Sequence, residues 1–242
     1  MNRWGFNLDQ IPDLIQRLKR CSKSIMIKSI YSHFSSAQNE IDNDFTIEQI
    51  NNFLQISAMF HESFNYDIGQ HIHNSSGLLN FPKTFLPFNF SRLGIGLYGL
   101  LDDPKLQSVG ELRCRISQVR DLKLNETVGY NRLFIANKKM KIATIPFGYA
   151  DGLQRSWGNG ILKFYFRGYL LPTVGNISMD SCSIDVSDIF HQHPGMDNNS
   201  LINEEVIYFG QDRPIWELAN ELNTIPYEII ATLSRRIKRI YN

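Results

Sequence analysis

Apolar residues recur at helical spacing in two early stretches of the chain, with shorter β-rich runs between and after them. A first helix is expected over NLDQIPDLIQRLKR and a second over DFTIEQINNFLQISAMF. Strands that end in polar or glycine-containing turns are favoured over SIMIKSIYSHF, FNYDIGQHIHNSSG and SRLGIGLYGL. This alternation over residues 1–100 is typical of a parallel sheet or barrel. The repeating apolar positions are Ile11, Leu14, Ile15 and Leu18 in the first helix, and Phe45, Ile50, Phe53, Leu54 and Ile56 in the second.

The period of the apolar positions changes to two from about Asp103, as expected for strands with one buried face. The alternating side chains are Leu112, Cys114 and Ile116, then Leu162, Phe164 and Phe166, then Cys182, Ile184 and Val186. Turn signals separate these runs, and one late helix is expected over IWELANEL. The pattern predicts an α/β domain over residues 1–103 and a mostly antiparallel β-domain over residues 104–242, with LDDP at the boundary.

The first domain is short for the architecture that its pattern suggests. A (β/α)8 barrel needs about 200–250 residues, so the first domain supplies roughly half of one. It is therefore expected to be either a smaller α/β fold or half a barrel, which would leave two sheet edges uncovered. The opening MNRWGF carries no secretory signal and leads directly into the first helix, which favours a chain that begins in the middle of a fold.

Composition narrows the class of protein. With 43% hydrophobic residues and a net charge of +1, the chain can bury a core and has no charge bias towards nucleic acid. Cys21, Cys114 and Cys182 are too far apart to suggest a disulfide framework or a zinc site, and this spacing fits a reducing cytosol. No apolar run approaches the length of a membrane span. We therefore expect a soluble cytoplasmic protein without a metal, a membrane or a nucleic acid as partner.

A basic run closes the chain over residues 235–239. Its cations alternate with apolar residues, which favours a solvated strand or helix face over a phosphate-binding patch.

Polar side chains gather where predicted strands end or turn, and site residues concentrate at such places. They are His33, His71, Asn74, Ser75, Arg92, Gly94 and Tyr130. The Ser75 hydroxyl and the backbone at Gly94 suit an anion, and barrels commonly bind phosphate at the loops after strands 7 and 8. Taken singly, each histidine is more often a hydrogen-bonded structural residue, and a tyrosine such as Tyr130 more often packs in the core or at the rim.

Taken together, these stretches resemble one family, the alanine racemases, which are fold-type III pyridoxal-phosphate enzymes. The motifs that carry the resemblance run in order along the whole chain: MNRWGF, YSHF with DNDFTIEQ, HIHNSSG, RLGIGLYG, ETVGYNRLF, IATIPFGYADGL, VGNISMDSCSIDV and NTIPYEIIATLSRRIKRIY. The resemblance implies that residues 1–103 are the C-terminal half of a TIM barrel and residues 104–242 the family's β-domain. It also implies a homodimer that interconverts L-alanine and D-alanine with pyridoxal 5′-phosphate, for peptidoglycan synthesis.

The resemblance also implies roles for residues that handle the substrate. Tyr130 matches the catalytic base that acts in the partner subunit's site, on the face opposite the cofactor lysine. Free tyrosine has a pKa of about 10, so this role requires a charged neighbourhood. Arg3 matches the arginine that contacts the substrate carboxylate, and Met179 matches a residue whose backbone meets the substrate. Tyr149 matches the tyrosine at the substrate access corridor.

The cofactor would be held by residues of both domains. Arg92 matches the arginine that faces the pyridine nitrogen, with His71 orienting it. Because arginine does not readily give up its proton, that nitrogen stays unprotonated, which favours moving one proton over decarboxylation or transamination. The remaining residues implied are His33 and Asn74 beside the ring, and Ser75, Gly94, Ile95 and Tyr227 around the phosphate.

Two alternatives stay open. The family's cofactor lysine stands in a Lys-Ala-Asn-x-Tyr-Gly-like motif, and no lysine here stands in that context. The chain could therefore be a truncated form that acts only in dimerisation or interaction. A fold-type III amino-acid decarboxylase has the same architecture, but those enzymes place an acid where Arg92 stands. The segments ETVGYNRLF and IPYEI also resemble the family branch that is fused to a Mur ligase.

Overall fold

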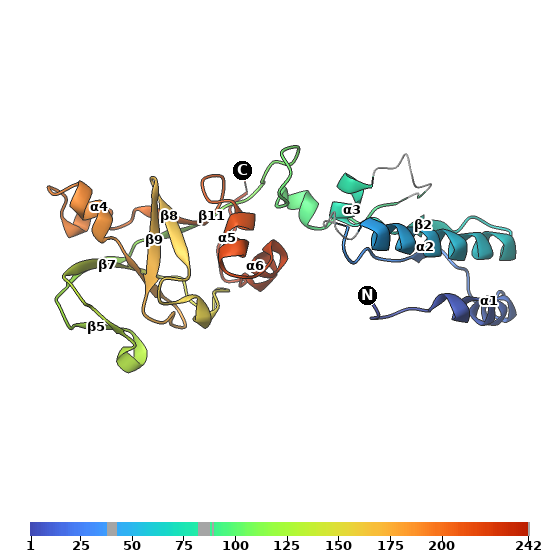
Figure 1. Ribbon diagram of the computed structural model, residues 1–242, viewed down its shortest axis with the longest axis horizontal. Coiled ribbons are helices and arrows are strands. Elements are labelled where there is room, and N and C mark those ends of the chain that lie inside the picture. The colour runs from blue at the N-terminus through green and yellow to red at the C-terminus, as the bar shows by residue number, and fades with distance from the viewer. Residues whose placement is uncertain (38–42, 82–87, 89, 242) are drawn as a thin grey trace. The chain divides into compact units, whose positions relative to one another are not determined.

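The computed structural model describes residues 1–37, 43–81, 88 and 90–241. Contacts divide the chain into two compact units, Met1–Leu97 (unit 1) and Tyr98–Asn242 (unit 2). In Figure 1 unit 1 is coloured from blue to green, and unit 2 from green to red. Among the described residues, no helix combines the length and the apolar content that a membrane crossing demands. The domain limit expected after residue 103 stays a prediction.

Unit 1 is built from short strands and longer helices. Strands β1 (Ser29–Tyr31) and β2 (Gly69–His71) pair in parallel, with Tyr31 opposite His71. The connection between them contains α2 (Asn43–Ser63), which is the crossover that a parallel pair requires. The predicted alternation of strand and helix is confirmed for these elements (Figure 1). The others are η1 (Leu8–Gln10), α1 (Ile11–Arg20), α3 (Ser75–Asn80) and η4 (Ile95–Tyr98).

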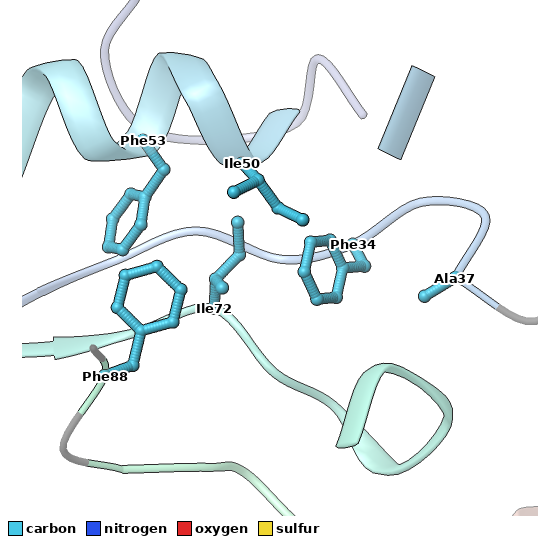
Figure 2. Packing of buried hydrophobic residues seen from close by; sticks show 6 residues of the cluster. All are labelled: Phe34, Ala37, Ile50, Phe53, Ile72 and Phe88. Atoms are coloured by element: carbon cyan, nitrogen blue, oxygen red, sulfur yellow. The ribbon is translucent and has the colours of Figure 1, made fainter. Parts of the chain in front are cut away.

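The buried face of α2 carries the core of unit 1. Ile50 and Phe53 are buried as expected, and the Phe53 ring meets that of Phe88 edge-on at 5.3 Å between centroids (Figure 2). A second cluster joins α1 to α2 through Ile11 and Ile15. Phe45 was expected on the same face but is 48% exposed. At 3.6 residues per turn it points about 140° away from Ile50, outside the packed stripe.

The strand expected over SRLGIGLYGL is wrong. This stretch contains the 3-10 turn η4, and the amide of Leu97 donates to the carbonyl of Gly94 at 3.0 Å. The amides of Gly94 and Gly96 both donate to the Ser75 hydroxyl oxygen, each at 3.1 Å. The backbone therefore curls around a side chain instead of extending along a neighbouring strand.

Unit 2 contains a seven-stranded sheet in the order β3-β11-β8-β9-β10-β7-β4, and every neighbouring pair is antiparallel. The strands are β3 (Leu112–Arg115), β4 (Gln118–Leu122), β7 (Met140–Ile145), β8 (Lys163–Phe166), β9 (Tyr169–Val174), β10 (Cys182–Asp185) and β11 (Glu205–Phe209). A separate hairpin pairs β5 (Thr127–Val128) with β6 (Phe134–Ile135). The predicted antiparallel β-domain is thus confirmed.

The period-two pattern identifies the buried face of this sheet correctly. The alternating residues predicted to be buried are all 9% exposed or less: Leu112, Cys114, Ile116, Leu162, Phe164, Phe166, Cys182, Ile184 and Val186. The late helix is confirmed as α5 (Ile215–Glu221). Two further helices, α4 (Ser187–Gln192) and α6 (Pro226–Thr232), are too short for an apolar repeat to reveal them. The short 3-10 turns are η5 (Tyr130–Arg132), η6 (Arg155–Trp157) and η7 (Asn198–Leu201).

Candidate active site

Arg92 is the centre of a polar cluster in unit 1. Its Nη2 donates to the Ser32 carbonyl at 2.5 Å and to His33 Nδ1 at 3.0 Å. Its Nη1 donates to the His71 carbonyl at 3.3 Å and to His71 Nδ1. Because β1 and β2 run in parallel, Ser32, His33 and His71 lie at the same ends of the two strands. The sheet therefore fixes the plane of the guanidinium.

Both histidines of this cluster are neutral. Each accepts at Nδ1, so its single proton sits on Nε2. Burial lowers the pKa of His33 and of His71, and the charge of Arg92 lowers both further. The positive charge of Arg3 also lowers the pKa of His33, so this arginine lies near the cluster. The Tyr31 ring stacks on His71 at 5.2 Å between centroids and lies 5.0 Å from the Arg92 guanidinium carbon.

One donor of Arg92 is left for a ligand. An arginine has five N–H groups, and here four of them face acceptors within unit 1. Among the described residues, the fifth, on Nε, has no acceptor. It can donate to a neutral acceptor such as an unprotonated ring nitrogen, and a carboxylate in its place could not. This donor fits the role that the family resemblance implies for Arg92.

Ser75 and the loop after Arg92 form a second part of the site. The buried Ser75 hydroxyl accepts from Gly94 and Gly96 and keeps its own proton to donate. A Cβ atom at Gly96 would lie 3.1 Å from the Ser75 side chain, whereas one at Gly94 would meet no atom within 4 Å. Ile95 between them is buried. The open backbone at Gly94 can approach an anion, which fits a phosphate group.

Asn74 precedes Ser75 in the chain and lies near His33. Its Oδ1 accepts from the Gly77 amide at 2.8 Å and so caps α3, while its Nδ2 lies 3.5 Å from His33 Nε2. The neighbouring His73 is buried and donates from Nε2 to the Phe81 carbonyl at 2.9 Å.

In unit 2 the structure brings Tyr149 and Met179 side by side. The amide of Tyr149 donates to the Ser178 carbonyl at 3.0 Å, and that of Ala150 donates to the Met179 carbonyl at 2.9 Å. These residues lie in the loops that follow β7 and precede β10, which are paired strands. The side chains of Tyr149 and Met179 are 42% and 54% exposed. The two loops thus expose these side chains at one end of the sheet.

Tyr130 lies at the tip of the β5–β6 hairpin and is 73% exposed. Gly129 before it has a φ of +76°, and a Cβ there would lie 3.7 Å from the Asn176 amide. The backbone at the tip of the hairpin therefore lies against the residues that follow β9, while the Tyr130 side chain remains largely exposed. Tyr227 lies in α6 and is 41% exposed.

Sequence reasoning missed a set of charged residues next to these loops. Arg236 donates from Nε and Nη2 to Asp151, at 2.6 and 3.1 Å, and from Nη2 to Asp180 at 2.6 Å. The basic run was predicted to be a solvated strand or helix face, but residues 235–239 form neither. No local pattern could reveal the pairing, because Arg236 and Asp151 are 85 positions apart.

A depression of about 450 Å³ lies elsewhere on unit 2 and contains none of the predicted site residues. Its cations Arg113, Arg115 and Arg167 are already paired with Glu204 or Glu205. Over the described ranges, no group of three or more histidine, cysteine or acidic residues is arranged to hold a metal.

Two domain profiles match the chain in sequence order. Residues 1–102 match "Alanine racemase, N-terminal domain" and residues 109–241 match "Alanine racemase, C-terminal domain". The alanine racemase of Clostridium tetani is 34% identical, over 100% of this chain and 62% of its own length. That of Methanococcus maripaludis is 33% identical, over 100% of this chain and 64% of its own.

A solved structure of an alanine racemase is similar to the whole chain. It is the crystal structure of alanine racemase from Bartonella henselae with covalently bound pyridoxal phosphate, at a TM-score of 0.82 and 29% identity. The match covers 100% of this chain and 64% of that one. The chain therefore spans less than two thirds of the length of each of these relatives.

Proposed function

The chain belongs to the alanine racemase family, and we propose that it takes part in the interconversion of L-alanine and D-alanine with pyridoxal 5′-phosphate. The in-order match of both domain profiles is the observation that carries the proposal. We further propose that unit 1 is the C-terminal half of a (β/α)8 barrel, which the parallel β1–α2–β2 connection supports. A cytoplasmic location and a role in peptidoglycan synthesis belong to the same proposal.

Unit 1 supplies most of the residues that would hold the cofactor. When bound, pyridoxal 5′-phosphate withdraws electrons from the α-carbon of an amino acid and so makes its proton acidic. Arg92 would donate its Nε–H to the ring nitrogen, and because arginine keeps its proton, that nitrogen stays unprotonated. Limited electron withdrawal favours proton transfer over loss of the carboxylate. An amino-acid decarboxylase is less well supported, because it would require an acid at this position.

The phosphate end would be held by hydrogen bonds and by close backbone approach. The Ser75 hydroxyl proton and the open side of Gly94 suit phosphate oxygens, and Ile95 belongs to the same loop. Tyr227 is a further phosphate contact that the family resemblance implies. His33 and Asn74 would lie beside the ring, and His71 would keep Arg92 in plane.

Substrate handling would fall to four other residues. Arg3 would bind the substrate carboxylate, for which its planar donors are suited. Tyr130 would move the α-proton in the site of a partner subunit within a homodimer, and its exposed place on a hairpin supports this role. Tyr149 and Met179 would line the substrate side of the same site.

The test is a binding titration with pyridoxine 5′-phosphate. This analogue has the ring and the phosphate but no aldehyde, so it does not react with surface lysines as pyridoxal 5′-phosphate would. Saturable binding is expected, and Ser75→Ala should weaken it about fivefold, the loss of one neutral hydrogen bond. Arg92→Ala should weaken it as well. Pyridoxine without phosphate should bind more weakly than the phosphate ester to the native chain.

The matched control is Ser156→Ala, an exposed serine of unit 2 whose hydroxyl donates to the Gln154 side chain. Binding that is unchanged in both Ser75→Ala and Arg92→Ala would contradict the proposed cofactor site.

A further inference from the structure

Asp151 is a buried carboxylate that ends the turn carrying Tyr149. The Asp151 amide donates to the Gly148 carbonyl at 3.0 Å, and the Gly148 amide donates back to Asp151 Oδ2 at 2.8 Å. A buried carboxylate needs charged or hydrogen-bonded partners to remain ionised. Arg236 supplies them through two parallel hydrogen bonds, a strong and directional arrangement.

The same guanidinium also reaches the second loop. Arg236 Nη2 donates to Asp180 Oδ1, and Asp180 directly follows Met179 in the chain. One cation therefore joins the residues that flank Tyr149 and Met179. Without it, two carboxylates would face each other with no charge between them, and like charges repel.

The C-terminal segment is tied down at the same place. The Ser234 amide donates to the Asp151 carbonyl at 3.0 Å, and a Cβ atom at Gly152 would lie 2.8 Å from the Thr232 carbonyl oxygen. This close packing requires the small residue at position 152, and it fixes the end of α6, the helix that carries Tyr227.

We propose that Arg236 is a positioning residue that locks together the loop of Tyr149, the loop of Met179 and the segment that follows α6. The inference deepens the proposed function, since these residues are its proposed substrate and phosphate contacts. Arg236 itself touches neither ligand in this scheme; it sets the spacing of the residues that do.

Amide hydrogen exchange on the full chain measures this directly. Three amides report on the lock: those of Tyr149 and Ala150 bridge the two loops, and that of Ser234 ties the C-terminal segment. In Arg236→Ala all three should exchange about tenfold faster, the loss expected for a charge-assisted hydrogen bond. Amides of β7 that bond to β10 should keep their native rates, because the sheet does not depend on this cation.

A milder variant and a matched control sharpen the result. Asp180→Asn removes the negative charge of one arm only, so the Tyr149 and Ala150 amides should exchange faster while the Ser234 amide stays protected. Arg239→Ala is the control, because Arg239 donates to the backbone carbonyls of Ser234 and Ile237. Its effect on the Tyr149 and Ala150 amides should be negligible.

Two results would overturn the inference. One is native exchange at Tyr149 and Ala150 in both Arg236→Ala and Asp180→Asn. The other is an equal rise at β7, which would mean that Arg236 contributes only to global stability. The exchange rates depend neither on cofactor binding nor on racemisation. A failed pyridoxine 5′-phosphate titration would therefore count against the proposed function and leave the lock intact.

Discussion

Gly148 is the position where a single methyl group should separate the loop of Tyr149 from the loop of Met179. A Cβ atom built there would lie 2.4 Å from the carbonyl oxygens of both Ser178 and Met179. Real Cβ atoms essentially never come closer than 3.0 Å, so Gly148→Ala must push the loops apart by at least the difference of 0.6 Å. The obstacle is backbone on both sides, so no side-chain rotation can relieve it.

The cost follows from the hydrogen bonds that span the gap. The bonds from Tyr149 to Ser178 and from Ala150 to Met179 are 3.0 and 2.9 Å long. Stretched by the same amount, both pass the range of a normal N–H···O bond. At about 1 kcal/mol each, their loss lowers the free energy of unfolding of unit 2 by about 2 kcal/mol.

Gly195→Ala is the matched control. A Cβ atom there meets no atom within 4 Å, and φ at Gly195 is not in the left-handed region. Both variants reduce the freedom of the unfolded chain equally, so their difference isolates the clash. We expect Gly148→Ala to be about 2 kcal/mol less stable than Gly195→Ala. Urea denaturation followed by fluorescence of the buried Trp157 measures this difference. Equal stability of the two variants, with native exchange at the Tyr149 amide, would refute the reasoning.

Two further predictions concern buried and titrating groups. The Tyr208 hydroxyl is fully buried without a partner among the described residues. Tyr208→Phe should therefore raise the free energy of unfolding by about 1 kcal/mol in urea denaturation. A decrease would mean that the hydroxyl has a hydrogen-bond partner. Burial, reinforced by Arg92, holds the pKa of His33 and His71 below 6.5 in the folded chain, so the unfolded chain binds more protons as pH falls through 6.5. In calorimetry, unit 1 should therefore unfold at a lower temperature near pH 5.5 than near pH 7.5. The unfolding temperature of unit 2 should change little, because its shifted groups include carboxyls such as Asp151, whose ordinary pKa is 3.8. An unchanged midpoint for unit 1 would contradict this.

Elements whose burial repeats within a few residues were predictable from the sequence. Phe164 and Phe166 alternate along β8, and Ile50 and Phe53 lie on one face of α2, because local geometry alone decides which side chains share a face. Phe45 shows the limit of the method, since only the packed part of a helix face is buried.

Features that depend on distant partners were not predictable from local pattern. The stretch around Gly94 reads as an apolar strand, but its backbone bends around the Ser75 hydroxyl, 19 positions earlier in the chain. Arg236 reads as a solvated cation until the fold places Asp151 and Asp180 beside it. The candidate site residues came from resemblance to a family, because polar residues at strand ends suggest a site without revealing its chemistry.

We propose that Tyr130 acts as the catalytic base in a partner subunit's site, and a complementation experiment tests this claim most directly. The measurement is D-alanine formation by a full-length relative, such as the Bartonella henselae enzyme, whose own matching tyrosine is replaced by phenylalanine. If Tyr130 serves a partner's site, a mixed dimer with this chain should regain racemase activity, and the Tyr130→Phe chain should restore none. No gain in a mixture where the mixed dimer is shown to exist, or an equal gain with Tyr130→Phe, would contradict the claim.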